Sequence, residues 1–327
     1  IKRIVELFEI FVEKERIKVE KKQRRISVYS KPLLLFLESL FGKINGKKAE
    51  NIKVPEIMFK TGQKNVEAFL RGLFKGDGCI SENKIELGSK SKELVSGVSY
   101  LLTLLGIRFK VWKREDNMWM ISIYGSYSIN KFKKDILKEK VKLRIRKSYN
   151  ERLRIPPVSI LLKSLKEKGG LKYGKDLPEV LFESAVSGRK RFGVMRLKKM
   201  VRVLEKKLPE DLKTTKEFKT LKFFVTKNLL WTKVEEIKPV AGRWMYDLET
   251  EKGYFVGGFI PFVLHNSKWY GESLPYDEEI VVMKDGIIYR EKIGKIVEKR
   301  KKVFVVSFDE NGRVKFSPIK DWIKHKS

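Results

Sequence analysis

Three consecutive residues, His265, Asn266 and Ser267, have the side chains that self-cleavage of a peptide bond requires. The amide nitrogen of an Asn can attack its own backbone carbonyl, close a succinimide and cut the chain after itself. A neighbouring imidazole can polarise that carbonyl and protonate the leaving amine by general acid-base catalysis. The hydroxyl of Ser267 can accept an acyl group before Asn266 cyclises. The triplet therefore predicts self-catalysed cleavage after Asn266.

Two strand-like apolar runs, residues 245–248 and 254–264, precede the triplet. They are interrupted by Lys-Gly at 252–253 and Gly-Gly at 257–258, which suit turns or bulges. With Tyr246-Asp247-Leu248 and Tyr254-Phe255-Val256, the closing triplet resembles the C-terminal end of an intein, the self-excising element of protein splicing. The resemblance implies a β-rich splicing domain of the Hint type in which Asp247 assists the C-terminal cleavage.

A new β pattern begins at Ser273. Asp-Gly at 285–286 and Asn-Gly at 311–312 predict hairpin turns, the second pairing residues 303–308 with 313–317. The pattern resembles the N-terminal start of an intein, which implies that Ser273 attacks the preceding carbonyl in an N-to-O acyl shift. The family's Thr/Asn-x-x-His element is missing, and His325 is expected to be a strand residue rather than that catalyst. The alternative is a small β-hairpin domain with an incidental serine.

These segments predict the back of one intein at 233–266, a host (extein) piece at 267–272 and the front of a second intein at 273–327. In the alternative, a permuted or split arrangement, both β parts belong to one intein and fold together. The run Ser-Lys-Trp-Tyr-Gly at 267–271, after Asn266, is similar to the Asn-Ser-x-Tyr-Gly of family B DNA polymerases with one extra residue. A DNA polymerase or another replication protein is therefore the expected host.

A second constellation lies in residues 69–78, a helical pattern that ends in an acidic residue. Gly72 and Gly76 are four residues apart, so they share one helix face and allow a second helix to approach closely. Asp77 lies at the helix end, and Gly78 can adopt the left-handed turn that stops the helix. The run resembles the LAGLIDADG motif of homing endonucleases. The alternative is an ordinary amphipathic helix with an Asp at its end.

The LAGLIDADG resemblance implies that Asp77 binds Mg²⁺, which activates water and stabilises charge on the scissile phosphate of double-stranded DNA. It also implies a basic residue near the active site at Lys53, Lys90 or both; for each, the alternative is a solvated lysine. Single-chain members of the family use two motifs, and this sequence shows one. Residues 1–60 are typical of the portion that follows a first motif, so that motif is expected upstream.

The formal net charge of +32 is concentrated in residues 1–230, which hold 55 Lys and Arg against 26 Asp and Glu. Such a field attracts nucleic acid. A Lys-rich thermophile surface would show Glu rising with Lys, which this excess contradicts. Within the region, residues 187–207 predict an amphipathic helix whose cationic face can contact DNA phosphates. The rival function is therefore a non-catalytic DNA-binding protein with a structural β tail.

The whole chain predicts an α+β protein. A partial α/β LAGLIDADG endonuclease domain is expected over 1–129, a basic, mainly helical DNA-binding segment over 130–232, and partial Hint domains beyond it. The single cysteine, Cys79, excludes an internal disulfide framework and a Cys-rich zinc site. No apolar run is long enough to span a bilayer and no signal peptide opens the chain, so we expect no membrane partner and a cytoplasmic location.

Overall fold

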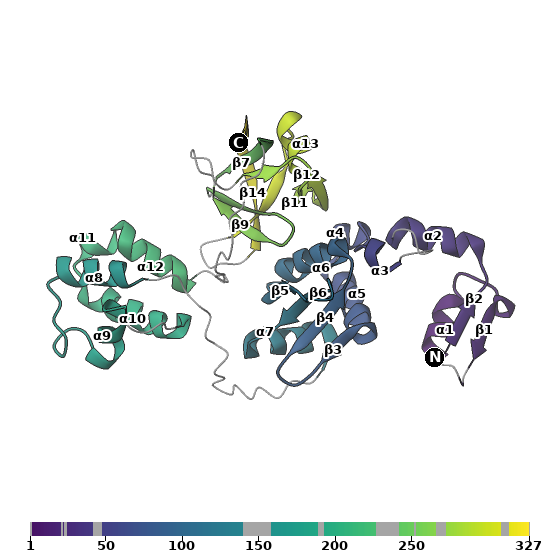
Figure 1. Ribbon diagram of the computed structural model, residues 1–327, viewed down its shortest axis with the longest axis horizontal. Helices are drawn as coiled ribbons and strands as arrows, with labels where there is room; N and C mark the ends of the chain where they lie inside the picture. Colours follow the sequence, from purple (N-terminus) through teal and green to yellow (C-terminus); the bar gives the residue numbers. More distant parts are fainter. Residues whose placement is uncertain are drawn as a thin grey trace.

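The computed structural model describes residues 2–20, 22, 25–41, 48–139, 158–188, 193–226, 242–251, 253–265, 273–308 and 314–326. Along the sequence these residues form an N-terminal unit, a central domain, a helical unit and a C-terminal β-rich unit (Figure 1). Helices and sheets are both abundant, so the mixed fold class expected from the sequence is confirmed.

The N-terminal unit pairs a hairpin with helices. Strands β1 (Ile17–Glu20) and β2 (Arg25–Val28) are antiparallel with Ile17 opposite Val28, and their alternation of basic and β-branched residues is typical of a hairpin. Several of its large apolar side chains are exposed: Ile4, Leu7, Ile10, Phe11, Leu35 and Phe36. The other elements are α1 (Lys2–Phe8), the 3-10 helix η1 (Lys14–Arg16), α2 (Lys31–Phe41) and α3 (Lys48–Asn51).

The central domain is an antiparallel sheet of order β3-β4-β6-β5 with helices against one face. Alternate residues of β4 and β6, among them Leu87 and Ile121, point into the core that α5 and α6 cover. The elements are α4 (Ile57–Lys60), α5 (Gln63–Gly76), β3 (Gly78–Ile80), β4 (Ile85–Ser89), α6 (Lys92–Leu104), β5 (Phe109–Lys113), β6 (Trp119–Ile123), α7 (Ser126–Lys131) and the π-helix η2 (Phe132–Leu137).

The core of the central domain continues beyond residue 129, where the sequence analysis placed a boundary. Phe132, Ile136 and Leu137 of η2 are buried in it, and the rings of Phe132 and Phe74 lie 4.8 Å apart. The Arg71 guanidinium also donates a hydrogen bond to the Ile136 carbonyl at 3.2 Å. Basic composition alone does not mark this end, because the lysines of η2 lie between apolar residues that pack inward.

The helical unit has a core of its own, built from residues between Val158 and Val225. The helix predicted over 187–207 begins only at Val194, after an earlier helix that ends at Val186. Gly188, with φ +70°, takes a left-handed backbone conformation just beyond that end. The unit consists of α8 (Ser159–Lys168), α9 (Glu179–Val186), α10 (Val194–Lys207), α11 (Glu210–Lys213) and α12 (Lys216–Thr226).

The β-rich unit is an antiparallel sheet of order β10-β7-β14-β13-β11-β12, with β8 and β9 paired beside it. The Asp-Gly hairpin predicted at 285–286 is confirmed, with positive φ at both residues. The elements are β7 (Trp244–Thr250), β8 (Tyr254–Gly257), β9 (Phe262–His265), β10 (Leu274–Pro275), β11 (Glu279–Lys284), β12 (Ile287–Lys292), α13 (Ile293–Glu298), β13 (Phe304–Phe308) and β14 (Val314–Lys326).

Strand β7 joins the two halves of this unit, because it lies between β10 and β14. Tyr246 is opposite Leu274 on one side and opposite Lys324 on the other. Strand β14 first pairs with β13 and then, from Ile319 onward, with β7, with a bulge between Ile319 and Asp321. The segments on the two sides of residues 266–272 therefore share one sheet.

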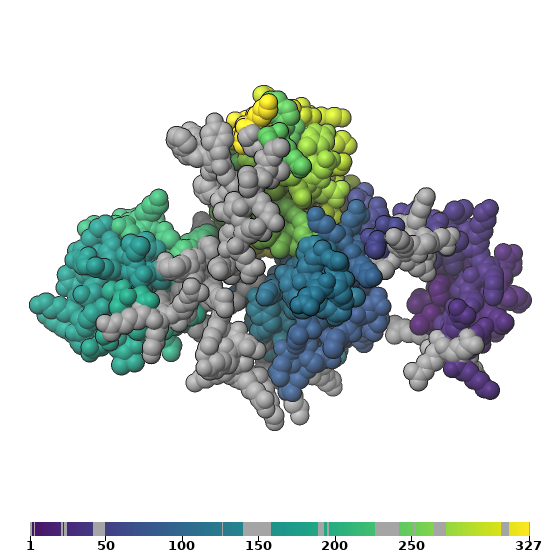
Figure 2. Space-filling view, in the orientation of Figure 1, coloured from purple at the N-terminus to yellow at the C-terminus, as the bar shows by residue number. Residues whose placement is uncertain are grey.

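The β-rich unit packs directly on the central domain, and the space-filling view shows their surfaces in contact (Figure 2). The hydroxyl of Tyr100 in α6 donates a hydrogen bond to the Gly258 carbonyl at 2.9 Å. The Arg290 guanidinium donates to Ser96 Oγ at 3.0 Å. Val256, Val281 and Val306 belong to the same buried cluster as the core of the central domain. The two units therefore have a continuous hydrophobic core.

Among the helices that the structure describes, none combines the length and the apolar character needed to cross a membrane.

Candidate active sites in the central domain and the β-rich unit

Asp77 directly follows helix α5, as the sequence predicted. The left-handed turn expected at Gly78 is wrong, because Gly78 has no positive φ and is already the first residue of strand β3. Its backbone N–H closes the helix by donating to the Leu73 carbonyl at 2.9 Å, and its side chain is exposed. Gly72 and Gly76, one turn apart on α5, are also exposed, and a Cβ at either position would meet nothing within 4 Å. In the described part of the chain, the face predicted for close helix packing is therefore open.

The structure brings Lys90 and Lys53 to the same end of the sheet as Asp77. Strand β3 starts directly after Asp77 and β4 ends directly before Lys90, and antiparallel pairing places these two strand ends side by side. Lys53 is joined to this end because the Ser91 hydroxyl donates a hydrogen bond to the Ile52 carbonyl. Lys90 is exposed and Lys53 is half-buried. Their catalytic roles remain predictions.

The fit of this end to Mg²⁺ depends on how many carboxylates it offers. The described residues contain no group of three or more His, Cys, Asp or Glu side chains that could hold a metal ion. Mg²⁺, however, is commonly held by one or two carboxylates together with substrate phosphates and water. The exposed carboxylate of Asp77 fits such a site as one protein ligand, with lysines nearby to neutralise phosphate.

A row of polar side chains on the open face of the sheet was not predicted from the sequence. Ser122 donates a hydrogen bond to Glu86, Lys84 pairs with the same carboxylate at 2.8 Å, and Trp112 Nε1 donates to Ser122 Oγ at 3.3 Å. Burial raises the pKa of Glu86, but the bonds from Lys84 and Ser122 outweigh it and hold the pKa below its ordinary value. The period-two alternation of 85–89 and 119–123 could have revealed this row.

In the β-rich unit, Asp247 and His325 project from the same face of neighbouring strands. Asp247 lies opposite Ile323, and His325 lies opposite Met245, two residues away along each strand. Asp247 is buried, with 2% of its surface exposed, and its Oδ1 accepts a hydrogen bond from the Leu248 N–H at 2.7 Å. His325 is a strand residue, as predicted.

Ser273 directly precedes β10 and is half-buried. Its Oγ is 2.7 Å from Nε2 of His325, a contact that sequence analysis did not predict. Because Leu274 is opposite Tyr246, the next position in the same register places Ser273 beside Asp247. The structure thus gathers Ser273, directly before β10, with His325 of β14 and Asp247 of β7.

The remaining predicted residues lie at the end of β9. His265 closes that strand with its backbone paired to Tyr254, while Asn266 and Ser267 lie outside the described residues. A Cβ built on Gly257 would lie 3.1 Å from Leu264 Cδ1 and 2.8 Å from Leu274 Cδ1. The residue before His265 and the residue after Ser273 therefore approach the same point of β8.

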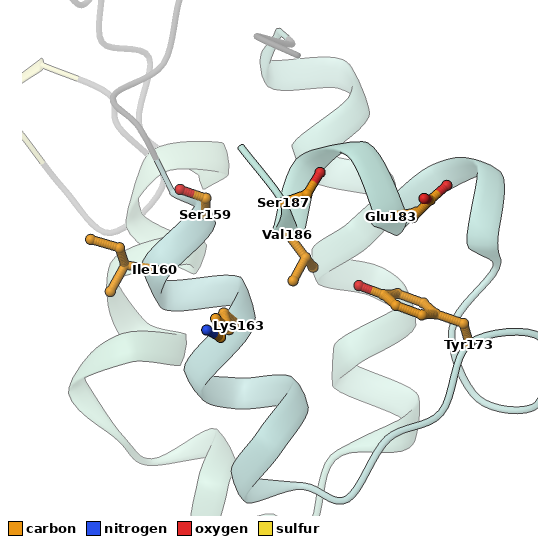
Figure 3. A pocket seen from close by; sticks show the side chains of 7 residues that line it. All are labelled: Ser159, Ile160, Lys163, Tyr173, Glu183, Val186 and Ser187. Atoms are coloured by element: carbon orange, nitrogen blue, oxygen red, sulfur yellow. The ribbon is translucent and has the colours of Figure 1, made fainter. Parts of the chain in front are cut away.

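A further cavity, of about 500 Å³, lies in the helical unit, outside both clusters of predicted residues (Figure 3). Residues of α8 and α9 and Tyr173 between them line it, with Lys163 and Glu183 as its charged side chains. Burial, together with Glu183 and Glu179, raises the pKa of Tyr173. The cavity does not contribute to either candidate active site.

Several known proteins whose names describe different functions are similar to this chain. The chain is 26% identical over 243 residues to the DNA-directed RNA polymerase subunit Rpo1C of Methanocaldococcus jannaschii, covering 69% of this chain and 27% of that protein. It is 36% identical over 106 residues to a probable translation initiation factor IF-2 of Thermococcus kodakarensis, covering 32% of this chain and 9% of that protein. It is 33% identical over 114 residues to a DNA polymerase of Thermococcus hydrothermalis, covering 33% of this chain and 7% of that protein.

The chain thus spans no more than about a quarter of the length of these relatives. One family model matches, that of the LAGLIDADG-like domain, over residues 64–137. The match begins in α5, which carries the motif, and ends at Leu137, where the core of the central domain also ends. Residues 64–137 therefore form a LAGLIDADG-like domain.

Proposed function

We propose that this chain is a protein-splicing element that carries a LAGLIDADG DNA endonuclease half and is inserted in a larger host protein. The observation that carries the splicing proposal is the shared sheet of the β-rich unit. Strands β7–β9 lead to Asn266 and strands β10–β14 follow Ser273, yet β7 pairs with both β10 and β14. This pairing supports the permuted or split arrangement, in which both parts act as one Hint-type unit.

The proposed cleavage proceeds at the end of β9. Asn266 cyclises and breaks the bond to Ser267, while His265 polarises the carbonyl and protonates the leaving amine. Asp247, a buried acid on the neighbouring sheet, assists this step, and the Ser267 hydroxyl accepts the acyl group beforehand. Ser273 provides the hydroxyl for the corresponding acyl shift at the second junction.

The relatives support an inserted element. Their names describe an RNA polymerase subunit, a translation initiation factor and a DNA polymerase, and the shared segment is a small part of each. Parts of this chain thus match proteins with very different names, which is expected of an element that acts on its own rather than in the activity of each protein. A DNA polymerase or another replication protein remains our proposed host.

The endonuclease is the second proposed activity, with double-stranded DNA as its substrate. Mg²⁺ bound beside Asp77 would supply the Lewis acid for phosphodiester hydrolysis. Asp77 provides one carboxylate ligand, and Lys53 and Lys90 offset phosphate charge. The open α5 face at Gly72 and Gly76 can accept the helix of a second motif, which would bring the second carboxylate. Double-strand cleavage therefore requires that second half.

Intact-mass analysis after warm incubation tests the splicing proposal on the full chain. We expect the wild type to release a fragment broken after Asn266, and Asn266→Ala to stay whole because it cannot form the succinimide. The control is Asn65→Ala, which removes an exposed asparagine from α5 and should cleave like the wild type. If all three chains stay whole, also after the addition of separate intein halves, the rival non-catalytic DNA-binding protein is the correct description.

A further inference from the structure

Ser273 and His325 form a hydrogen-bonded pair in the described structure. The 2.7 Å separation of Oγ and Nε2 is typical of a hydroxyl bonded to an imidazole nitrogen. A serine hydroxyl is a weak nucleophile unless a neighbouring base takes its proton, and His is the most frequent such base. The pair can therefore act as a nucleophile and its base. The competing explanation is a hydrogen bond that only stabilises the sheet.

The fold holds Ser273 firmly. The next two residues, Leu274 and Pro275, pair with β7, and the Leu274 side chain packs beside Gly257. The carbonyl of Tyr276 accepts a hydrogen bond from the Gly294 N–H at 3.1 Å, which ties the segment to α13. Three consecutive residues after Ser273 are thus held by the sheet or the helix, so its hydroxyl has a defined position.

The face on which His325 lies depends on the bulge in β14. Between Ile319 and Asp321 the strand gains one residue relative to β7. An extra residue inverts the in-out alternation of all later side chains relative to the partner strand. With this bulge, His325 lies on the same face as Asp247 and within reach of Ser273, while its neighbour Lys324 pairs with Glu298 at 2.7 Å.

We propose that His325 is the general base, and then the general acid, for the attack of Ser273 on the peptide carbonyl before it. This inference rests on the proposed splicing function. The Oγ–C bond forms as the Oγ proton passes to Nε2, and the same proton then passes to the Ser273 nitrogen as the C–N bond breaks. An ester replaces the amide with no net change in protons. His325 thus supplies the imidazole that this acyl shift requires.

Cleavage of the full chain by hydroxylamine at neutral pH tests this step. At that pH hydroxylamine cuts an ester or thioester, whereas its cleavage of Asn-Gly amides, present here at 45–46 and 311–312, needs alkaline pH. In an Asn266→Ala background, we expect release of a 273–327 fragment by mass spectrometry. His325→Ala should slow that release on the order of 10²-fold, the usual contribution of a general base. His325→Gln, which keeps a polar side chain but has no basic nitrogen, should be equally slow.

Ser273→Cys distinguishes catalysis from structure. A thiol is partly ionised near neutral pH and needs a base far less than a hydroxyl does. With Cys at position 273, His325→Ala should therefore slow cleavage much less than it does with Ser273. An equal loss in both backgrounds would show that His325 only supports the fold and would overturn the proposal. The control Lys324→Ala changes the opposite face of β14.

Two further outcomes separate the inference from the function on which it rests. If chains with Ser273 release the 273–327 fragment at the same rate with His325 as with His325→Ala, the inference fails while the splicing proposal stands. If no variant, including Ser273→Cys, gives a hydroxylamine-sensitive bond, then Ser273 is not a nucleophile. In that case the proposed chemistry at this junction and the inference fail together.

Discussion

Gly257 lies where the strands that flank the two predicted junctions meet. A Cβ there would approach side-chain atoms of Leu264, Leu274 and Ile280 to between 2.8 and 3.1 Å. We expect Gly257→Ala to destabilise the β-rich unit by about 1–3 kcal/mol, the usual result of overpacking, and to slow fragment release at both junctions. Thermal melting and intact-mass analysis measure the two effects.

Gly72→Ala is the matched comparison for Gly257→Ala. Its Cβ meets nothing within 4 Å, and it lies inside helix α5, where Ala is the better helix former. We expect an unchanged or slightly raised melting midpoint. Equal melting midpoints for the two variants would contradict the close packing at Gly257.

Features that depend on neighbouring residues, such as turns and helix ends, were predictable from the sequence. Contacts between distant strands were not. The Asp285-Gly286 turn and the position of the Asp77 helix end depend on neighbouring residues, so the sequence pattern predicted both, although Gly78 enters β3 without the left-handed turn expected of it. The contact between Ser273 and His325 depends on the register of β14 against β7. No local pattern in the sequence indicates that His325 reaches Ser273.

At the scale of elements, helix α5 is held to the end of its domain through Glu67. This nearly buried carboxylate accepts hydrogen bonds from Gln63 at 2.8 Å and from Lys138 at 2.6 Å. Burial raises the pKa of Glu67, but the bonds from Lys138 and Gln63 outweigh it, so the pKa lies below its ordinary value. The folded state therefore favours the ionised carboxylate.

The linkage sets the direction of the pH dependence. A folded-state pKa below the unfolded value stabilises the fold above the unfolded pKa, and the effect is lost as the pH falls through the folded pKa. We expect Glu67→Gln to destabilise the central domain by about 1–3 kcal/mol near pH 7. The difference in melting midpoint from the wild type should shrink below about pH 4. Glu82→Gln, at an exposed glutamate, should melt like the wild type at each pH.

The long-range pairing of elements explains the difference between the expected and observed organisation. The apolar run over 254–264 forms β8 and β9, and the interruption predicted at Gly-Gly 257–258 is confirmed, because Gly258, with φ +92°, turns the chain back. In contrast, η2 joins the core of the central domain although its composition is basic. Burial against distant partners decided the second case, and this information is absent from local periodicity.

At the scale of the whole molecule, the excess positive charge should be concentrated at a DNA-binding surface. Helix α10 exposes Lys198 and Lys199 and, one turn later, Arg202. We expect their combined replacement by Ala to weaken binding to non-specific double-stranded DNA and to lower the slope of log K against log[salt] by up to about 3. Fluorescence anisotropy over a series of salt concentrations measures that slope.

A charge-matched control separates a specific surface from a diffuse field. Lys284, Lys299 and Lys302 are exposed in the β-rich unit, outside the strongly basic region. Their combined replacement by Ala removes the same net charge and should leave the slope almost unchanged. A similar loss in both triple variants would place DNA binding in the overall charge of the chain rather than on α10.

The continuous core between the central domain and the β-rich unit bears on how such an element can change during evolution. Tyr100, whose pKa is raised by burial, lies wholly inside this contact, and the Arg290 guanidinium is 5.6 Å from its ring centre. A deletion of the nuclease domain would leave Val256, Val281 and Val306 facing water. A lineage that no longer needs DNA cleavage can therefore lose Asp77 by a single substitution, but it can discard the domain only after it has rebuilt the surface of the sheet.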